Sequence, residues 1–251
     1  MPHDIVMGLD LGQATDPTAL AILRESPVLG ADGRIATDLR GGILLSFDCV
    51  HLERFPLGTE YPAIVGRVEE LVRSPKLQRS RLVIDATGAG RPVVDLFFNS
   101  RMPAEITPLT ITAGSEVRED QWNRTSNRAY WVPKIELVST VQSLLQTRRL
   151  RVVPRLALAD VLKRELLDFK IKVTASANET FSTGREHAHD DLVLAVAMAA
   201  WLGERQVPQP MVAVSRRFPG PASRDRPTGP IHPLARSINQ KISYMNRMRG
   251  F

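Results

Sequence analysis

The stretch DIVMGLDLGQATDPTALAIL, residues 4–23, contains an unexpected acid in an apolar segment. Asp10 lies among the apolar residues Val6, Met7, Leu9 and Leu11, which predict a buried strand. Burying a carboxylate is costly unless a positive group neutralises it. The partner is either an arginine, which would make Asp10 structural, or a metal ion, which requires further carboxylates from elsewhere in the chain.

The surrounding pattern predicts an α/β fold. Apolar runs predict strands at 5–11, 18–23, 42–52, 81–85, 105–112 and 150–154. Helical spacing predicts helices at 61–72, from near Pro92, and at 133–147, 158–169 and 189–203. We predict a polar loop at 113–130 and an extended or hairpin segment at 171–183. Three antiparallel strands followed by alternating helices and strands imply a mixed sheet, antiparallel first and then parallel, with helices on both faces.

Composition divides the chain into two parts. The 251 residues are 43% hydrophobic, enough for one large domain, which we place at 1–206. Residues 207–251 contain seven prolines, eight basic residues and one acid, so they hold the excess of the net charge of +6. We predict that this tail is disordered or ordered by a partner, with a short helix at 237–248. A basic tail suits phosphate backbones or an acidic partner; the alternative is that it only aids solubility.

The chain has features of a cytoplasmic protein. No run reaches the roughly 18–20 apolar residues of a membrane span, and the N-terminus lacks a signal-peptide pattern. Cys49 is the only cysteine, which excludes an intrachain disulfide and a cysteine-based zinc site.

Three other acids are candidates to join Asp10. Asp85 ends the apolar strand 81–85 and precedes a Gly-rich turn, at the sheet edge where α/β proteins form their sites. Asp190 and Asp191 begin the apolar helix 189–203. The structural alternatives are a turn or capping role for Asp85 and an N-cap for the pair. If the acids converge, their oxygens select Mg²⁺ or Mn²⁺, and two such ions would hydrolyse a phosphodiester.

Several segments resemble the nuclease domain of phage terminase large subunits, an RNase H-like fold. The resemblance covers about residues 5–204 and is strongest at VIDATGAGRPVVDLF and HAHDDLVLAVAMAAW. It implies a DNA endonuclease of phage genome packaging, with two divalent cations and little sequence selectivity. Asp10 would bridge the ions, and Asp85 and Asp191 would hold one each. Asp190 is the alternative to Asp191 as a metal ligand. Asp16 matches an acid of the family that would support the ligands without binding the metal itself.

One departure from that family is large. A terminase large subunit has an ATPase motor before its nuclease, with a phosphate loop of the form GxxxxGK[ST], and this sequence has no such loop. We therefore expect an isolated nuclease domain, a split gene product or a repurposed relative, in the host cytoplasm if phage-encoded. A separate motor, a small terminase subunit or a portal are candidate partners of the basic tail, besides double-stranded DNA.

Other side chains suit contacts with DNA. Lys134 matches a lysine of the family, and Arg124, Arg128 and Arg185 are further candidates for phosphate contacts. The loop REDQWNRTSNRAYW mixes basic and aromatic residues, as nucleic-acid stacking surfaces do, although a loop with packed aromatic residues is the alternative. His187 and His189 flank the acid pair and suggest zinc weakly; His189 could instead assist protonation near the metals.

Three alternatives remain open. GLDLGQATDPTA also resembles the first phosphate loop of sugar kinases and actin-like ATPases, but the chain is short for that class and lacks a late Gly-rich adenosine-binding stretch. A Holliday-junction resolvase of the RuvC type shares the fold and the acids. An inactive nuclease-like module that only binds a partner is the third.

Overall fold

The structure, a computed structural model, describes residues 5–12, 16–39, 41–77, 79–88, 90–122, 127–169 and 190–205. The strands are β1 (Ile5–Asp10), β2 (Ala19–Pro27), β3 (Leu45–Arg54), β4 (Arg81–Asp85), β5 (Glu105–Thr112), β6 (Arg118–Gln121), β7 (Arg128–Pro133) and β8 (Leu150–Val152). The helices are α1 (Tyr61–Val72), α2 (Gly90–Asn99), α3 (Lys134–Gln146), α4 (Ala159–Phe169) and α5 (Asp191–Arg205). The predicted tail at 207–251 and the segment 171–183 lie outside the described residues.

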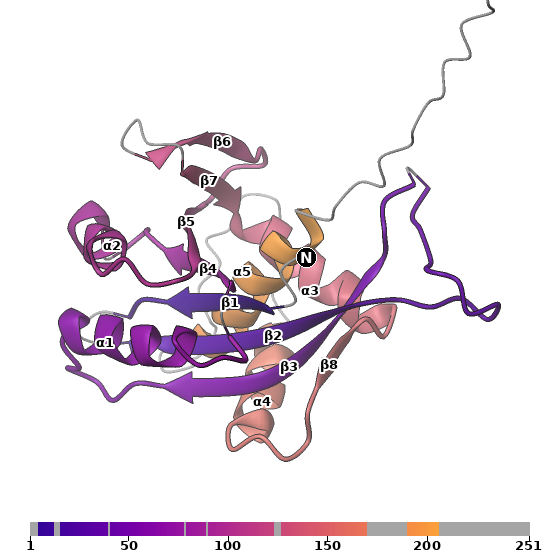
Figure 1. Ribbon diagram of the computed structural model, residues 1–251, viewed down its shortest axis with the longest axis horizontal. Coiled ribbons are helices and arrows are strands. Elements are labelled where there is room, and N and C mark those ends of the chain that lie inside the picture. Colours follow the sequence, from indigo (N-terminus) through magenta and orange to yellow (C-terminus); the bar gives the residue numbers. More distant parts are fainter. Residues whose placement is uncertain are drawn as a thin grey trace, which may run out of the picture. The chain divides into compact units, whose positions relative to one another are not determined.

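The strands of the described residues form one sheet of eight, in the order β6-β7-β5-β4-β1-β2-β3-β8 (Figure 1). β1, β2 and β3 pair antiparallel, whereas β4, β5 and β7 continue from β1 as parallel neighbours. The predicted fold class, an α/β fold with a mixed sheet that is antiparallel first and then parallel, is confirmed.

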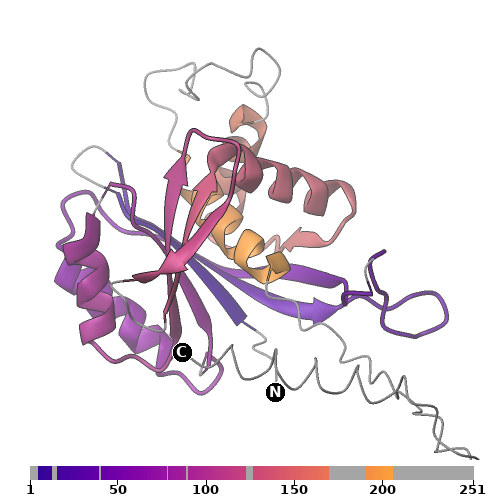
Figure 2. The same ribbon diagram turned by 90° about the horizontal axis from the view of Figure 1, so that it is seen from above.

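Helices cover both faces of this sheet (Figure 2). The apolar cluster on one face joins β-strand residues such as Met7 and Leu9 to α1 and α2, and the cluster on the other face joins Val6 and Ala19 to α3, α4 and α5. Successive strand residues point to opposite faces, so Asp10, four residues after Val6, points to the face covered by α5.

Helix α5 is the central element of its face. Every residue from Asp191 to Gly203 is buried, as its nearly continuous apolar sequence predicted. It approaches β1 so closely that a Cβ built on Gly8 would lie 1.9 Å from the carbonyl oxygen of Ala195. At the carboxyl end of α5, Arg81 is ion-paired with Glu25 and donates to the carbonyl of Leu202 at 3.4 Å. Packing and this buried ion pair together hold α5 against the sheet.

The predicted polar loop at 113–130 is wrong, because β6 and the start of β7 lie within it. All four residues of β6 are exposed, so this edge strand has no apolar alternation to mark it. β7 is an apolar strand held by its parallel pairing with β5, a long-range contact. Trp122 and Tyr130 are buried; Trp122 donates to Asp95 at 3.2 Å and Tyr130 packs edge-on against Trp201. This favours the packed-aromatic alternative for these two rings.

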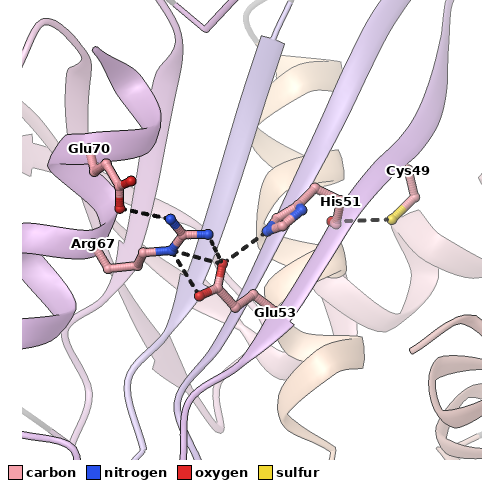
Figure 3. A network of polar contacts seen from close by, with 5 residues as sticks. All are labelled: Cys49, His51, Glu53, Arg67 and Glu70. Carbon is pink, nitrogen blue, oxygen red and sulfur yellow. Dashed lines mark hydrogen bonds and ion pairs between the residues drawn. The ribbon is translucent and has the colours of Figure 1, made fainter. Parts of the chain in front are cut away.

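A polar network fastens α1 to the opposite face of β3 (Figure 3). Arg67 contacts both oxygens of Glu53, at 3.0 and 3.2 Å, and Glu70 at 2.8 Å, while His51 contacts Glu53 at 3.0 Å. Burial works to raise the pKa of the Glu53 carboxyl, but the hydrogen bonds from Arg67 and His51 outweigh it and hold that pKa below its ordinary value.

We expect Arg67→Gln to lower the free energy of unfolding by about 0.5–1 kcal/mol near neutral pH, because the pair is partly exposed. The folded pKa of Glu53 is depressed, so its contribution is present above the unfolded pKa and is lost as the pH falls through the folded pKa. Urea unfolding at about pH 7 and about pH 3 checks this. An equal loss at both pH values would mean that packing of the Arg67 stem, not its charge, provides the stability.

Within the described residues, no helix has the length and apolar composition required to cross a bilayer.

Candidate metal centre

Asp10 and Asp85 meet at the carboxyl ends of two adjacent parallel strands. Leu9 of β1 pairs with Ile84 of β4, and each acid is the next residue along its strand. Both are buried, and the two carboxyl groups lie close enough to act on each other's pKa. Burial and the negative charges of Asp85, Asp190 and Asp191 raise the pKa of Asp10 well above its usual range. The structure thus brings together the four acids that the sequence singled out.

The turn after β4 fixes the orientation of Asp85. Its Oδ1 accepts hydrogen bonds from the backbone N–H of Thr87 at 2.8 Å and from the hydroxyl of the same residue. The Thr87 Oγ1 in turn accepts from the Ile111 N–H at 2.7 Å, which ties the turn to β5. Burial raises the pKa of Asp85, although Thr87 and the charge of Lys134 oppose that rise. Asp85 therefore has the predicted turn role and also contacts Asp10.

Asp190 and Asp191 lie at the start of α5, whose first residue is Asp191, and each has a basic partner. Asp190 directly precedes the helix, its carbonyl accepts from the Leu194 N–H at 2.9 Å, and its side chain contacts Lys134 Nζ at 2.8 Å. Asp191 is 3% exposed and contacts Arg54 through both oxygens, Oδ2 to Nε at 2.8 Å and Oδ1 to Nη2 at 3.0 Å. Asp190 is thus paired with Lys134, and the more buried Asp191 is paired with Arg54.

Arg54 and Glu165 are site residues that the sequence analysis missed. Asp10 pairs with Ala19 and Ala19 with Arg54, so all three side chains point to the α5 face. Glu165 projects from α4, contacts Arg54, and accepts from the Val193 N–H at 3.3 Å. Burial and the charge of Asp191 raise the pKa of Glu165 to about 7, against the opposing charge of Arg54.

Both missed residues had a signal in the sequence. Arg54 follows the predicted strand 42–52 by two residues, in phase with Leu52, which faces the core. Glu165 lies three residues after the buried Leu162, on the apolar stripe of α4. Each is a charged residue at a position of its strand or helix that faces the apolar core, as Asp10 is on its strand.

The donor set fits a hard divalent cation. It consists of carboxylate oxygens, the ligands that Mg²⁺ and Mn²⁺ prefer. Burial, together with the negative charges of the neighbouring acids, raises the pKa of Asp10, and a bound cation would favour its ionised form. Within the described residues, however, no three acids, histidines or cysteines are arranged as a ligand set. Asp190 and Asp191 are engaged by Lys134 and Arg54 instead. A cation that uses Asp190 or Asp191 as a ligand therefore competes with the ion pair of that acid.

The remaining predicted residues occupy varied positions. Lys134 lies in the centre itself, beside Asp190 and Asp85, rather than on the surface. Arg128 is exposed at the start of β7, 3.5 Å from Glu119. Asp16 is exposed in the turn before β2. Arg124, Arg185, His187 and His189 lie outside the described residues, so their predicted roles stay predictions.

No protein-family model and no curated protein matches this sequence. Among solved structures, the large terminase nuclease from thermophilic phage G20c is 20% identical, with 78% of this chain and 81% of that chain covered and a TM-score of 0.48. For the human cytomegalovirus terminase nuclease domain the identity is 19%, the coverage 79% and 82%, and the TM-score 0.44. The nuclease domain of the large terminase from bacteriophage SPP1, with bound Mn, is 14% identical; 80% of this chain and 86% of that chain are covered, and the TM-score is 0.42. The chain is thus structurally similar to nuclease domains of terminase large subunits, the class that the sequence resemblance named.

Proposed function

We propose that this protein is a metal-dependent DNA endonuclease that hydrolyses phosphodiester bonds. The observation that carries the proposal is the pair of buried carboxyls, Asp10 and Asp85, at the ends of adjacent parallel strands and within electrostatic reach of Asp191. A fold does not retain such a self-repelling group for stability, so its presence supports a functional role.

In this proposal Asp10, Asp85 and Asp191 hold two Mg²⁺ or Mn²⁺ ions, and Asp190 is the adjacent candidate. Two such ions supply an activated water and stabilise the charge that develops on a phosphodiester. The chain's own contribution is to hold the carboxylates on rigid elements. Asp85 is oriented by Thr87, Asp10 by β1, and Asp191 by the buried helix α5. Lys134 adds a positive charge beside Asp85, where a phosphate would need one.

The proposed substrate is double-stranded DNA, and the proposed setting is phage genome packaging or DNA processing. Both rest on the sequence resemblance carried by DATGAGRP and HDD. Arg128 is exposed, and its salt bridge with Glu119 is long, at 3.5 Å, so its side chain suits a contact with the phosphate backbone of DNA.

The test is plasmid nicking by the purified chain with Mn²⁺, Mg²⁺ or EDTA. We expect nicking with either metal, none with EDTA, and a loss of about 10²–10³-fold or more in Asp85→Asn. Asp48→Asn is the matched control, because Asp48 is an ion-paired acid on the same sheet, six residues from Arg54 along β3. Nicking that persists in Asp85→Asn, or in EDTA, would refute the proposal.

A further inference from the structure

Arg54 occupies the coordinating atoms of the most buried acid in the centre. Its guanidinium donates to both oxygens of Asp191, at 2.8 and 3.0 Å. The side chain of Asp191 is only 4% exposed. Charge-assisted hydrogen bonds in this two-pronged geometry are strong, and they engage both oxygens through which Asp191 would bind a divalent cation. Arg54 and a cation at Asp191 are therefore competitors.

Glu165 offers Arg54 a second partner at the same place. Arg54 Nη2 donates to Glu165 as well as to Asp191, so the guanidinium already bridges the two acids. Glu165 is itself anchored, because its other oxygen accepts from the Val193 N–H in the first turn of α5. A buried guanidinium that loses one acid is costly unless another acid keeps it paired. Glu165 meets this requirement without a large movement of Arg54.

We propose that Arg54 is a built-in competitor for the metal centre, exchanging between Asp191 and Glu165. Without a cation it neutralises Asp191, and it must release Asp191 to Glu165 before Asp191 can serve as a ligand. This inference rests on the proposed function, since it takes Asp10, Asp85 and Asp191 as the ligand set. Its consequence is that the chain sets its own metal affinity through residues that do not touch the metal.

The sign of a change in metal affinity separates this role from a structural one. A competitor weakens metal binding, so its removal tightens binding; a strut that positions Asp191 does the opposite. Hydrogen bonds to charged groups are each worth enough to shift binding about tenfold or more. We therefore expect Arg54→Gln to bind Mn²⁺ about tenfold more tightly than the wild type, by calorimetry of the full chain. Arg54→Lys keeps the charge but not the two-pronged contact, and we expect a smaller shift in the same direction.

Arg67→Gln is the matched control. Arg67 also contacts both oxygens of a carboxylate, that of Glu53, but on the opposite face of the sheet (Figure 3). We expect its Mn²⁺ affinity to equal that of the wild type. Circular dichroism and thermal unfolding establish that each variant is folded, and Arg54→Lys carries the test if Arg54→Gln does not fold.

A double-mutant cycle tests the part assigned to Glu165. With Glu165→Gln, Arg54 loses its alternative charged partner and stays on Asp191, so Mn²⁺ binding weakens several-fold or more. In the Arg54→Lys background the same substitution should have a clearly smaller effect, because the competitor is already weakened. Equal weakening in both backgrounds would mean that Glu165 acts on the cation directly, which overturns the exchange.

The remaining outcomes are also decisive. If the wild type binds Mn²⁺, Asp10→Asn does not, and both Arg54 variants bind no more tightly than the wild type, the inference about Arg54 is wrong while the proposed function stands. If neither the wild type nor any Arg54 variant binds Mn²⁺, both are wrong. Binding by the Arg54 variants but not by the wild type would be the strongest form of the expected result.

Discussion

Asp10→Asn is expected to abolish nicking and at the same time to stabilise the metal-free protein. In the proposed function Asp10 is a ligand of both ions, so its loss should lower the cleavage rate by about 10³-fold or more. In EDTA near neutral pH, the free energy of unfolding should rise by about 1 kcal/mol or more, because the amide replaces a carboxyl that is costly to bury beside three other acids. Such a gain in stability with a loss of activity is typical of functional residues.

The pH dependence of this gain has a definite sign. The folded pKa of Asp10 is raised above its unfolded value, so ionisation costs the folded state. That cost is absent below the unfolded pKa of about 3.9, grows as the pH rises, and becomes constant above the folded pKa. The advantage of Asn over Asp should follow the same course, and be absent in acid.

Excess Mn²⁺ should reverse the order of stability. Binding at a hundred times the dissociation constant stabilises a protein by about 2.7 kcal/mol, which the wild type gains and Asp10→Asn does not. Thermal unfolding of both proteins in EDTA and in Mn²⁺ measures this crossing, with Asp48→Asn as a control that should follow the wild type. A variant less stable than the wild type in EDTA would instead assign Asp10 a structural role with a positive partner.

The sequence predicted elements best where the pattern was local. The strands 81–85 and 105–112 and the helix 61–72 have the predicted bounds, because an uninterrupted apolar run or a clear helical spacing defines each. β6 had no such pattern, since its residues are all exposed and only its pairing with β7 makes it a strand. A strand without alternating apolar residues, such as β6, can be recognised only from its pairing in the assembled sheet.

The candidate site divides in the same way. Asp10 could be singled out as an acid inside an apolar strand, Asp85 as an acid at the carboxyl end of one, and Asp191 from the family resemblance. The structure places Asp85 and Asp191 within electrostatic reach of Asp10. The pairing of Arg54 with Asp191 and Glu165 could not be predicted, because these contacts span 137 and 111 residues. The sequence left open whether an arginine or a metal ion neutralises Asp10. The structure pairs Asp191 with an arginine and leaves Asp10 crowded by acids, which is why the two explanations compete at one centre.

Gly8→Ala is expected to disable the centre without changing any of its polar residues. The new Cβ would lie 1.9 Å from the carbonyl oxygen of Ala195 and 3.1 Å from the N of Ala199. Both are backbone atoms of α5, so no side chain can turn aside, and the helix or the strand has to shift. We expect a loss of about 3 kcal/mol or more in the free energy of unfolding, at or above the upper end for overpacking.

The same shift should separate the acids. Asp10 is two residues beyond Gly8 on β1, and Asp191 is one helical turn before Ala195 on α5. The steric conflict between Gly8→Ala and Ala195 therefore lies directly beside the two carboxylates. We expect nicking and Mn²⁺ affinity to fall together in the folded fraction of Gly8→Ala, measured below its unfolding temperature.

Gly66→Ala is the matched control for this variant. Gly66 is an exposed residue of α1, and a Cβ built on it meets nothing within 4 Å. Alanine is favoured over glycine inside a helix by roughly 0.5–1 kcal/mol, so this substitution should stabilise the protein and leave nicking unchanged. Opposite signs for the same chemical change would assign the effect at Gly8 to the close approach of α5 and β1. If Gly8→Ala were instead as stable and as active as the wild type, that approach could not be what positions Asp191 beside Asp10.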